Sequence, residues 1–252
     1  MYAILVDVTR CTGCERCVEA CVLEHDLNIR AADKDRATTR DGLTANRFCT
    51  VLPVAEGRFA RKSCMHCLEP SCVSACLVGG LTQTEEGAVI YDADKCIGCR
   101  YCMLACPFHI PRYEWSATVP FVRKCSLCFT RLKKGEIPAC VEACPNQALE
   151  FGEREDLLEI ARSRSNKDPS KYISHIWGEH EFGGTCVLYL SDVDLDALGW
   201  PEQEAVAIPG ITEPLISKTP HIGITVLASL CGLNWIIKRR TQLMGSAGEE
   251  EK

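Results

Sequence analysis

The sequence lacks the features that mark most enzymes and most nucleic-acid-binding proteins. It has no glycine-rich nucleotide fingerprint and no cluster of acid–base or nucleophilic side chains suited to substrate chemistry. Its 28 basic residues are outnumbered by 34 acidic ones, so the formal net charge is −6 and there is no cationic excess to drive nucleic-acid binding. We therefore expect a non-catalytic chain with no nucleic-acid partner.

Cysteine, by contrast, is abundant. The chain has 19 cysteines, and sixteen of them form four consecutive quartets. The first and third quartets have the spacing of bacterial ferredoxins, in which the fourth cysteine ligates the other cluster of a pair. The quartets are Cys11, Cys14, Cys17 and Cys21; Cys64, Cys67, Cys72 and Cys76; Cys96, Cys99, Cys102 and Cys106; and Cys125, Cys128, Cys140 and Cys144. Sixteen thiolates at four per cubane predict four [4Fe–4S] clusters.

Two other classes of cysteine-rich protein are the alternatives. A zinc-structured interaction protein usually joins two C-x2-C knuckles across a longer loop, whereas three ligands of the first quartet lie within seven residues. Disulfide frameworks are typical of short secreted chains, and this chain has 252 residues. The spacing therefore favours iron–sulfur clusters over both.

The order of the quartets predicts an α+β fold of two nested ferredoxin-like modules with pseudo-twofold symmetry. Quartets one and four form an outer module, residues 1–27 and 120–152, and quartets two and three form an inner module, residues 58–119. Each quartet is expected to open as a loop around its cluster and to close in a short helix, as residues 15–23 and 101–105 allow.

Further strands, helices and loops are expected between and after the quartets. Residues 2–8 form an apolar β-prone run. A polar insertion, residues 28–57, is expected to be a surface loop, either plain or in contact with a partner. An extension, residues 153–216, is expected to contact partners and to contain a helix at 153–163 and a strand at 186–190.

The second decisive feature lies near the C-terminus. Residues 219–237 carry no formal charge apart from titratable His221, and nineteen helical residues span about 28 Å. Trp235 occupies an interfacial position, and Lys238 begins a basic flank of three residues. We predict a single transmembrane anchor at residues 217–240, with a buried core helix of a freely diffusing polyferredoxin as the alternative.

The flanking charges predict the orientation of the anchor. The positive-inside rule places the acidic tail, residues 241–252, in the cytoplasm and the cluster domain on the periplasmic side. The sequence begins almost directly with an apolar strand and a ligand, so we expect no cleavable signal. The expected route is export as cargo of a signal-bearing partner after the clusters are loaded.

Four features together carry a family resemblance: the quartets, the run of residues 123–128, the Gly-Glu-His segment at residues 178–185, and the C-terminal anchor. The chain resembles the iron–sulfur beta subunit of membrane-bound formate dehydrogenase-N. The ferredoxin-type subunit of nickel–iron hydrogenase-2 shares nearly all of these features. Both belong to the dimethyl sulfoxide reductase iron–sulfur subunit family, in which the quartets alone do not specify the substrate.

The resemblance implies which cysteines share a cluster. Group I is Cys11, Cys14, Cys17 and Cys144; group II is Cys21, Cys125, Cys128 and Cys140; group III is Cys64, Cys67, Cys72 and Cys106; and group IV is Cys76, Cys96, Cys99 and Cys102.

The resemblance also implies a non-catalytic electron-transfer subunit. Its expected partners are a catalytic subunit and an integral membrane subunit that reduces quinone and can carry haem b. The catalytic subunit would hold a molybdenum or tungsten pterin if formate is the donor, as we expect, or a nickel–iron centre if hydrogen is.

A few residues outside the ligand set have candidate roles. Arg123 and Lys124 either raise the potential of a neighbouring cluster or form an exposed basic pair. Glu179 and His180 are expected at an interface rather than in catalysis, and His221 is expected to be interfacial. Small buried hydrophobic side chains are expected for Cys49, Cys186 and Cys231, the last facing lipid or another helix.

Overall fold

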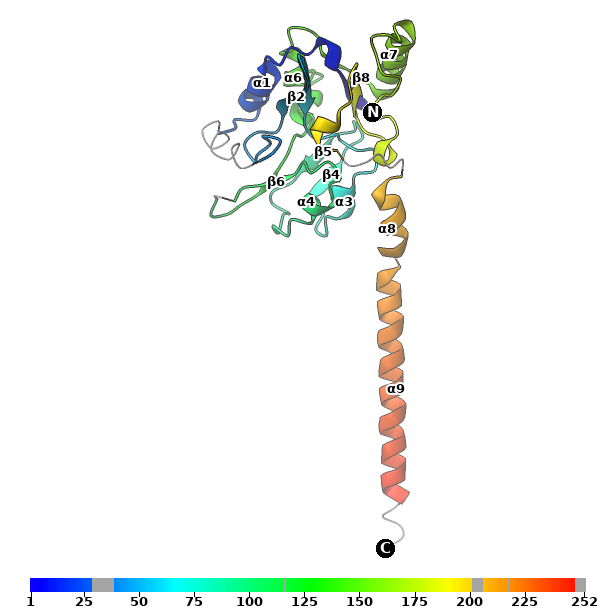
Figure 1. Ribbon diagram of the computed structural model, residues 1–252. Helices are drawn as coiled ribbons and strands as arrows, with labels where there is room; N and C mark the ends of the chain where they lie inside the picture. The colour runs from blue at the N-terminus through cyan, green and yellow to red at the C-terminus, as the bar shows by residue number, and fades with distance from the viewer. Residues whose placement is uncertain (29–38, 116, 201–205, 217, 248–252) are drawn as a thin grey trace. The chain divides into compact units, whose positions relative to one another are not determined.

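The computed structural model describes residues 1–28, 39–115, 117–200, 206–216 and 218–247, which form two units, Met1–Pro209 and Gly210–Lys252 (Figure 1). The expected insertion and acidic tail extend over residues 29–38 and 248–252, which lie outside the described residues.

A three-stranded sheet forms the centre of the first unit. Strand β1 (Tyr2–Asp7) lies between β8 (Leu149–Glu153), which is antiparallel to it, and β9 (Val187–Leu190), which is parallel. Both faces of β1 are covered, which explains its continuous apolar sequence. The strand ends one residue earlier than predicted because the Asp7 carboxylate accepts a hydrogen bond from the Thr9 amide and starts the 3-10 turn η1 (Val8–Arg10).

Helix α7 (Arg154–Lys167) covers one face of this sheet. Leu157, Leu158 and Ala161 pack against the β1 side chains Ala3 and Leu5. The helix continues past the predicted end at residue 163. Acidic residues in its first turn and basic residues in its last turn each lie at the end of the helix dipole that has the opposite charge, and this stabilises the helix. The segment after quartet four thus contributes to the hydrophobic core around the sheet.

Three hairpins surround the sheet. They are β2 (Thr50–Ala55) with β3 (Arg58–Lys62), β4 (Leu81–Gln83) with β5 (Val89–Tyr91), and β6 (Arg112–Tyr113) with β7 (Val122–Arg123). The remaining 3-10 turns are η2 (Glu181–Gly183) and η3 (Asp196–Leu198).

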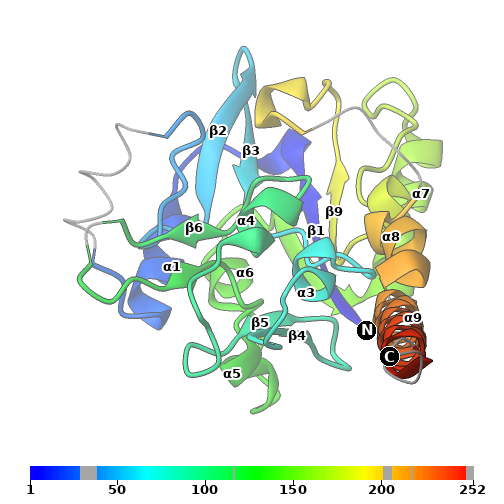
Figure 2. The ribbon, with the colours of Figure 1, turned by 90° about the horizontal axis from the view of Figure 1, so that it is seen from below.

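Short helices carry or follow the cysteines. They are α1 (Arg16–Glu24), α3 (Ser71–Ser74), α4 (Tyr101–Ala105), α5 (Phe129–Leu132) and α6 (Ala139–Glu142). The predicted helix at residues 101–105 is confirmed, and the one predicted at 15–23 is shifted by one residue. Helix α1 packs against α6 and α3 packs against α4, so the helix of quartet one meets that of quartet four, and the helix of quartet two meets that of quartet three (Figure 2).

The described part of the insertion differs from the predicted surface loop. Leu43, Phe48 and Cys49 are buried in the main hydrophobic core. The Asp41 carboxylate explains how a polar sequence packs here, since it accepts a hydrogen bond from the Leu43 amide and pairs with the Arg112 guanidinium at 2.6 Å. Neutralised and hydrogen-bonded charges can be brought into a packed region.

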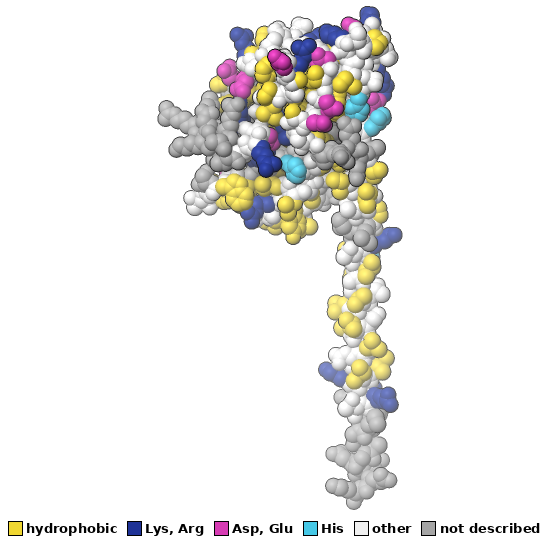
Figure 3. Space-filling model, viewed as in Figure 1, with side chains coloured by type: hydrophobic (Ala, Val, Ile, Leu, Met, Phe, Trp, Pro, Cys, Tyr) yellow, Lys and Arg dark blue, Asp and Glu magenta, His cyan; other side chains and the backbone are white. Residues whose placement is uncertain are grey.

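The second unit is helical. Helix α8 (Ile208–Ile216) leads to it and α9 (Thr219–Ala247) makes up most of it. Apolar side chains lie along α9, and basic ones follow toward its C-terminal part (Figure 3). Among the described residues, one helical stretch, Ile208–Thr241, has the length and apolar composition needed to cross a membrane.

Candidate iron–sulfur cluster sites

The group I cysteines converge on one cavity. Cys11, Cys14, Cys17 and Cys144 all line it, together with apolar side chains of β1, β2 and β8 and the buried Arg61. The cavity contains about 400 Å³ of empty space, part of it open to solvent. Four sulfur ligands around an apolar hollow are the donor set and surroundings that an iron–sulfur cubane requires.

The loops of quartets one and three have the same backbone geometry. Gly13 and Gly98 precede the second cysteine of their quartets, with φ of +74° and +70°. Glu15 and Arg100 follow that cysteine, and both also adopt the left-handed conformation, with φ of +56° and +64°. This conformation costs a non-glycine residue energy, and its recurrence at equivalent positions shows that the two loops are built to turn their cysteines inward in the same way.

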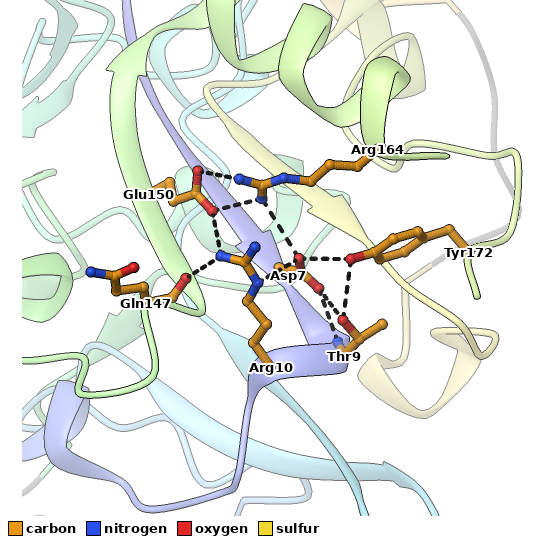
Figure 4. A network of polar contacts seen from close by, with 7 residues as sticks. All are labelled: Asp7, Thr9, Arg10, Gln147, Glu150, Arg164 and Tyr172. Carbon is orange, nitrogen blue, oxygen red and sulfur yellow. Dashed lines mark hydrogen bonds and ion pairs between the residues drawn. The ribbon is translucent and has the colours of Figure 1, made fainter. Parts of the chain in front are cut away.

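A buried polar network holds the start of quartet one (Figure 4). The fully buried Asp7 carboxylate accepts hydrogen bonds from the Thr9 amide at 3.1 Å, the Thr9 hydroxyl at 2.6 Å and the Tyr172 hydroxyl at 3.2 Å. Arg10, the residue before Cys11, pairs with the same carboxylate at 3.3 Å. These contacts fix the direction in which the chain enters the group I cavity.

The same network reaches the strand that follows quartet four. Arg10 donates to the Glu150 carboxylate at 3.1 Å, and Arg164 donates to both oxygens of that carboxylate at 2.6 and 2.7 Å. Glu150 lies on β8, six residues after Cys144. The network thus joins the two chain segments that supply the group I sulfurs.

The group IV cysteines line a second cavity. Cys76, Cys96, Cys99 and Cys102 surround about 330 Å³ of empty space, with apolar contacts from β4, β5 and β7. The backbone amide of Gly80 donates to the Cys76 sulfur at 3.1 Å, and that of Gly98 donates to the Cys96 sulfur at 3.4 Å. Such N–H···S bonds stabilise thiolate charge and influence the potential of a bound cluster.

Groups II and III lie deeper in the unit. A hydrogen bond that the Cys21 thiol donates to Cys49, together with burial, raises the pKa of Cys21, and the neighbouring charges of Cys125 and Cys140 add to the rise. Burial raises the pKa of Cys67, and the charges of Cys106, Cys64 and Cys72 add to it. These neighbours belong to the group II and group III sets implied by the resemblance.

Two further cysteines of these groups have raised thiol pKa values. Burial raises the pKa of Cys125 and of Cys72 to about 12, although the cations Arg61 and Lys124, respectively, oppose the rise. Thiolates are the form that binds iron, so cluster assembly must displace protons from these positions.

The spacing of the side chains also bears on the zinc alternative. Within the described ranges, no three Cys, His, Asp or Glu side chains approach one another closely enough to hold a single metal ion. A zinc ion draws its ligands to a single point, whereas a cubane holds its cysteine sulfurs further apart. The described cysteines therefore fit a cubane better than a zinc ion.

Two buried cations lie among the cysteines. The Lys124 ammonium donates to the carbonyls of Val89 at 2.5 Å and Cys125 at 2.9 Å, and lies 3.7 Å from the Cys64 sulfur. An exposed basic pair is therefore the wrong interpretation for Lys124, whereas Arg123 is partly exposed and pairs with Glu114. The other cation, Arg61, was missed by the sequence analysis because nothing local distinguishes it from the other basic residues of β3.

The remaining candidate residues have structural contacts. Glu179 pairs with Arg162, and His180 lies 3.4 Å from the Glu179 carboxylate. Cys49 and Cys186 are fully buried, as expected, and Cys231 is exposed on α9.

Comparisons with known proteins identify relatives of this chain. Residues 55–154 match the 4Fe-4S dicluster domain family. The chain is 34% identical over 281 residues to the hydrogenase-2 operon protein HybA of Escherichia coli O157:H7, a match that covers 95% of this chain and 84% of that protein.

Two further relatives match shorter parts of the chain. The nitrate-inducible formate dehydrogenase iron–sulfur subunit of Escherichia coli K12 is 34% identical over 199 residues, covering 75% of this chain and 67% of that protein. The probable anaerobic dimethyl sulfoxide reductase chain YnfG of the same strain is 37% identical over 164 residues, covering 62% and 75%. The resemblance inferred from the quartets is thereby confirmed: the chain belongs to the family of iron–sulfur subunits that includes HybA, the formate dehydrogenase iron–sulfur subunits and YnfG.

Proposed function

We propose that this chain is the electron-transfer subunit of a membrane-bound respiratory oxidoreductase and that groups I to IV each hold one [4Fe–4S] cluster. The convergence of complete cysteine groups on the two cavities is the observation that carries the proposal. A bound cluster supplies reversible one-electron transfer. The chain itself supplies thiolate ligands and an apolar surrounding.

The contacts between groups support one linear order. Burial raises the pKa of Cys17, and the charge of Cys140 in group II adds to it. In the same way, the charge of Cys64 in group III adds to the raised pKa of Cys125 in group II. The charge of Cys102 in group IV adds to the raised pKa of Cys72 in group III. Electrons would therefore pass along the order I, II, III, IV or its reverse.

The chain's own residues would control how easily each site accepts an electron. Buried apolar side chains keep water away from groups II and III, and backbone amides donate to several sulfurs. Lys124 places a positive charge beside group III and bonds the backbone of group II. Low solvent access and nearby charge are the protein's principal means of adjusting such potentials.

The catalytic partner is proposed to be a formate dehydrogenase or a hydrogenase. The sequence features favoured formate as the donor. The hydrogenase alternative is supported by the longer match, since the HybA alignment covers 95% of this chain and that with the formate dehydrogenase subunit covers 75%.

The membrane partner is proposed to be an integral subunit that passes the electrons to quinone. The apolar helix α9 supports anchoring in the bilayer. Under the positive-inside rule, the basic residues that follow Ile237 support a cytoplasmic C-terminus and a periplasmic cluster domain.

Elemental analysis of the complex, extracted anaerobically from membranes in mild detergent, tests the function. Four clusters require about sixteen iron atoms per chain. Accompanying molybdenum or tungsten would indicate a formate dehydrogenase, and nickel would indicate a hydrogenase. Stoichiometric zinc without iron would refute the proposal.

The ligand sets are tested by single substitutions. Cys144→Ala should remove or convert one cluster, whereas Cys49→Ala should retain the full iron content, because only Cys144 lines a cavity with three other cysteines. Equal iron loss in both variants would contradict the assignment.

A further inference from the structure

We propose that Arg61 sets the potentials of the group I and group II clusters, raising both above the values that their ligands alone would give. This inference rests on the proposed function. It assigns a specific task to a side chain that does not itself ligate iron.

Arg61 is a buried cation without a carboxylate partner. Its side chain is 2% exposed, and one guanidinium nitrogen donates to the Ser63 hydroxyl at 2.6 Å. Its Nε is buried and has no hydrogen-bond partner. Among the residues that the structure describes, no aspartate or glutamate forms an ion pair with it, in contrast to Arg58 on the same strand, which pairs with Asp192 at 2.7 Å.

Burying an ionised group without a counter-charge is costly, and arginine does not escape the cost by losing its proton. The nearby groups that can supply negative charge are thiolates. Arg61 lines the group I cavity. Its positive charge interacts electrostatically with Cys17 of group I and with Cys125 and Cys140 of group II. The side chain is therefore placed where two anionic clusters would stabilise it.

Cys49 also lies beside this cation. Its side chain hydrogen-bonds Arg61 and Cys21, and the charge of Arg61 acts on Cys49 as well as on the cluster ligands. Cys49 is therefore a position from which an added charge would reach Arg61 directly.

The two buried cations serve different sites. The charge of Lys124 is among the main influences on the thiol pKa values of Cys72 and Cys106 in group III, and the charge of Arg61 is among those on Cys17, Cys125 and Cys140 in groups I and II. When one electron moves to a group I or group II cluster from its neighbour, no bond is formed or broken and the acceptor gains one negative charge. A fixed positive charge nearby favours that reduced state.

The test is anaerobic redox titration of the complete complex, followed by electron paramagnetic resonance. Arg61→Gln should lower the equilibrium constant for reduction of two clusters at least tenfold. For one electron this is a shift of about 59 mV to lower potential. The other two clusters should change less than threefold. Arg61→Lys should preserve most of the potential, and Arg58→Gln is the matched control because its partly exposed charge is already paired.

A second variant keeps the inference testable if Arg61→Gln does not load its clusters. Cys49→Asp places a carboxylate against the guanidinium with Arg61 retained, and it should lower the same two potentials. Unchanged potentials in loaded Arg61→Gln, or in Cys49→Asp when Arg61→Gln is unloaded, would overturn the inference. Absence of iron from the wild-type complex would instead refute the proposed function.

Discussion

The buried carboxylate of Asp7 provides the sharpest test of how the fold supports a cluster site. Replacing Asp7 by Ala leaves the Thr9 amide and the buried end of the Tyr172 hydroxyl without their acceptor. Each unsatisfied buried group costs about 1–3 kcal/mol. Arg10 is partly exposed and keeps its ion pair with Glu150, so the loss of its pair with Asp7 adds little to the destabilisation. The expected total loss of stability is about 3–5 kcal/mol.

The effect should concentrate at group I. The network joins the segments before Cys11 and after Cys144, and both of these segments supply group I sulfurs. If the network breaks before the cluster is released, a loss of about 3–5 kcal/mol accelerates release by about two to three and a half orders of magnitude. The assay follows visible absorbance and released iron in guanidinium under anaerobic conditions.

The expected time course of iron release from Asp7→Ala has a fast phase, in which one cluster is lost, and a slow phase, in which the other clusters are lost. Asp7→Asn should show an intermediate rate, because its amide oxygen still accepts from Thr9. Glu153→Ala is the matched control on β8, since its pair with the N-terminus is exposed and surface pairs contribute little. Uniform release of all iron by Asp7→Ala, or a rate equal to that of Glu153→Ala, would refute the reasoning.

Three further predictions concern charge, pH and the anchor. Lys124→Gln should lower the reduction potential of one cluster, so that its equilibrium constant for reduction falls about tenfold. Arg123→Gln should not do so, because only Lys124 is buried beside a ligand. Equal shifts of the two variants in a redox titration would contradict this prediction. Burial raises the pKa of Cys186 from 9.0 to about 11, so its stabilising contribution, about 2–3 kcal/mol, is complete below pH 9 and is lost as pH rises through 11. Thermal unfolding of Cys186→Ala should therefore depend less on pH over that window than wild type does, and parallel profiles would disprove the assignment. Truncation after Pro209 should move the cluster domain from the membrane to the soluble fraction, as ultracentrifugation would show; a truncated chain still bound to membranes freed of the partner subunits would argue against α9 as the anchor.

Several elements could be read from the sequence because their signals are local. Helix α4 coincides with its predicted range, and β1 and β9 differ from their predicted ranges by one residue at one end. The apolar run that becomes α9 was recognised by length and composition alone. Each of these signals is contained in one short segment, so no knowledge of distant contacts was needed.

The insertion shows where such reasoning fails. Its polar composition predicted a surface loop, but Leu43 and Ala45 are buried. Asp41 pairs with Arg112, which lies 71 residues further along the chain, and that contact compensates the charge. Polar composition indicates exposure only when the charges have no distant partner.

The sequence by itself indicated the ligand chemistry, since soft thiolates at the spacing of ferredoxin loops suit iron–sulfur clusters. Tertiary structure alone decided the electrostatics around those ligands. Arg61 and Arg58 are chemically identical and three residues apart on β3, yet one is buried among cysteines and the other pairs with Asp192 at the surface. Burial and charge proximity arise from contacts between segments far apart in the chain, and so the local sequence does not contain them.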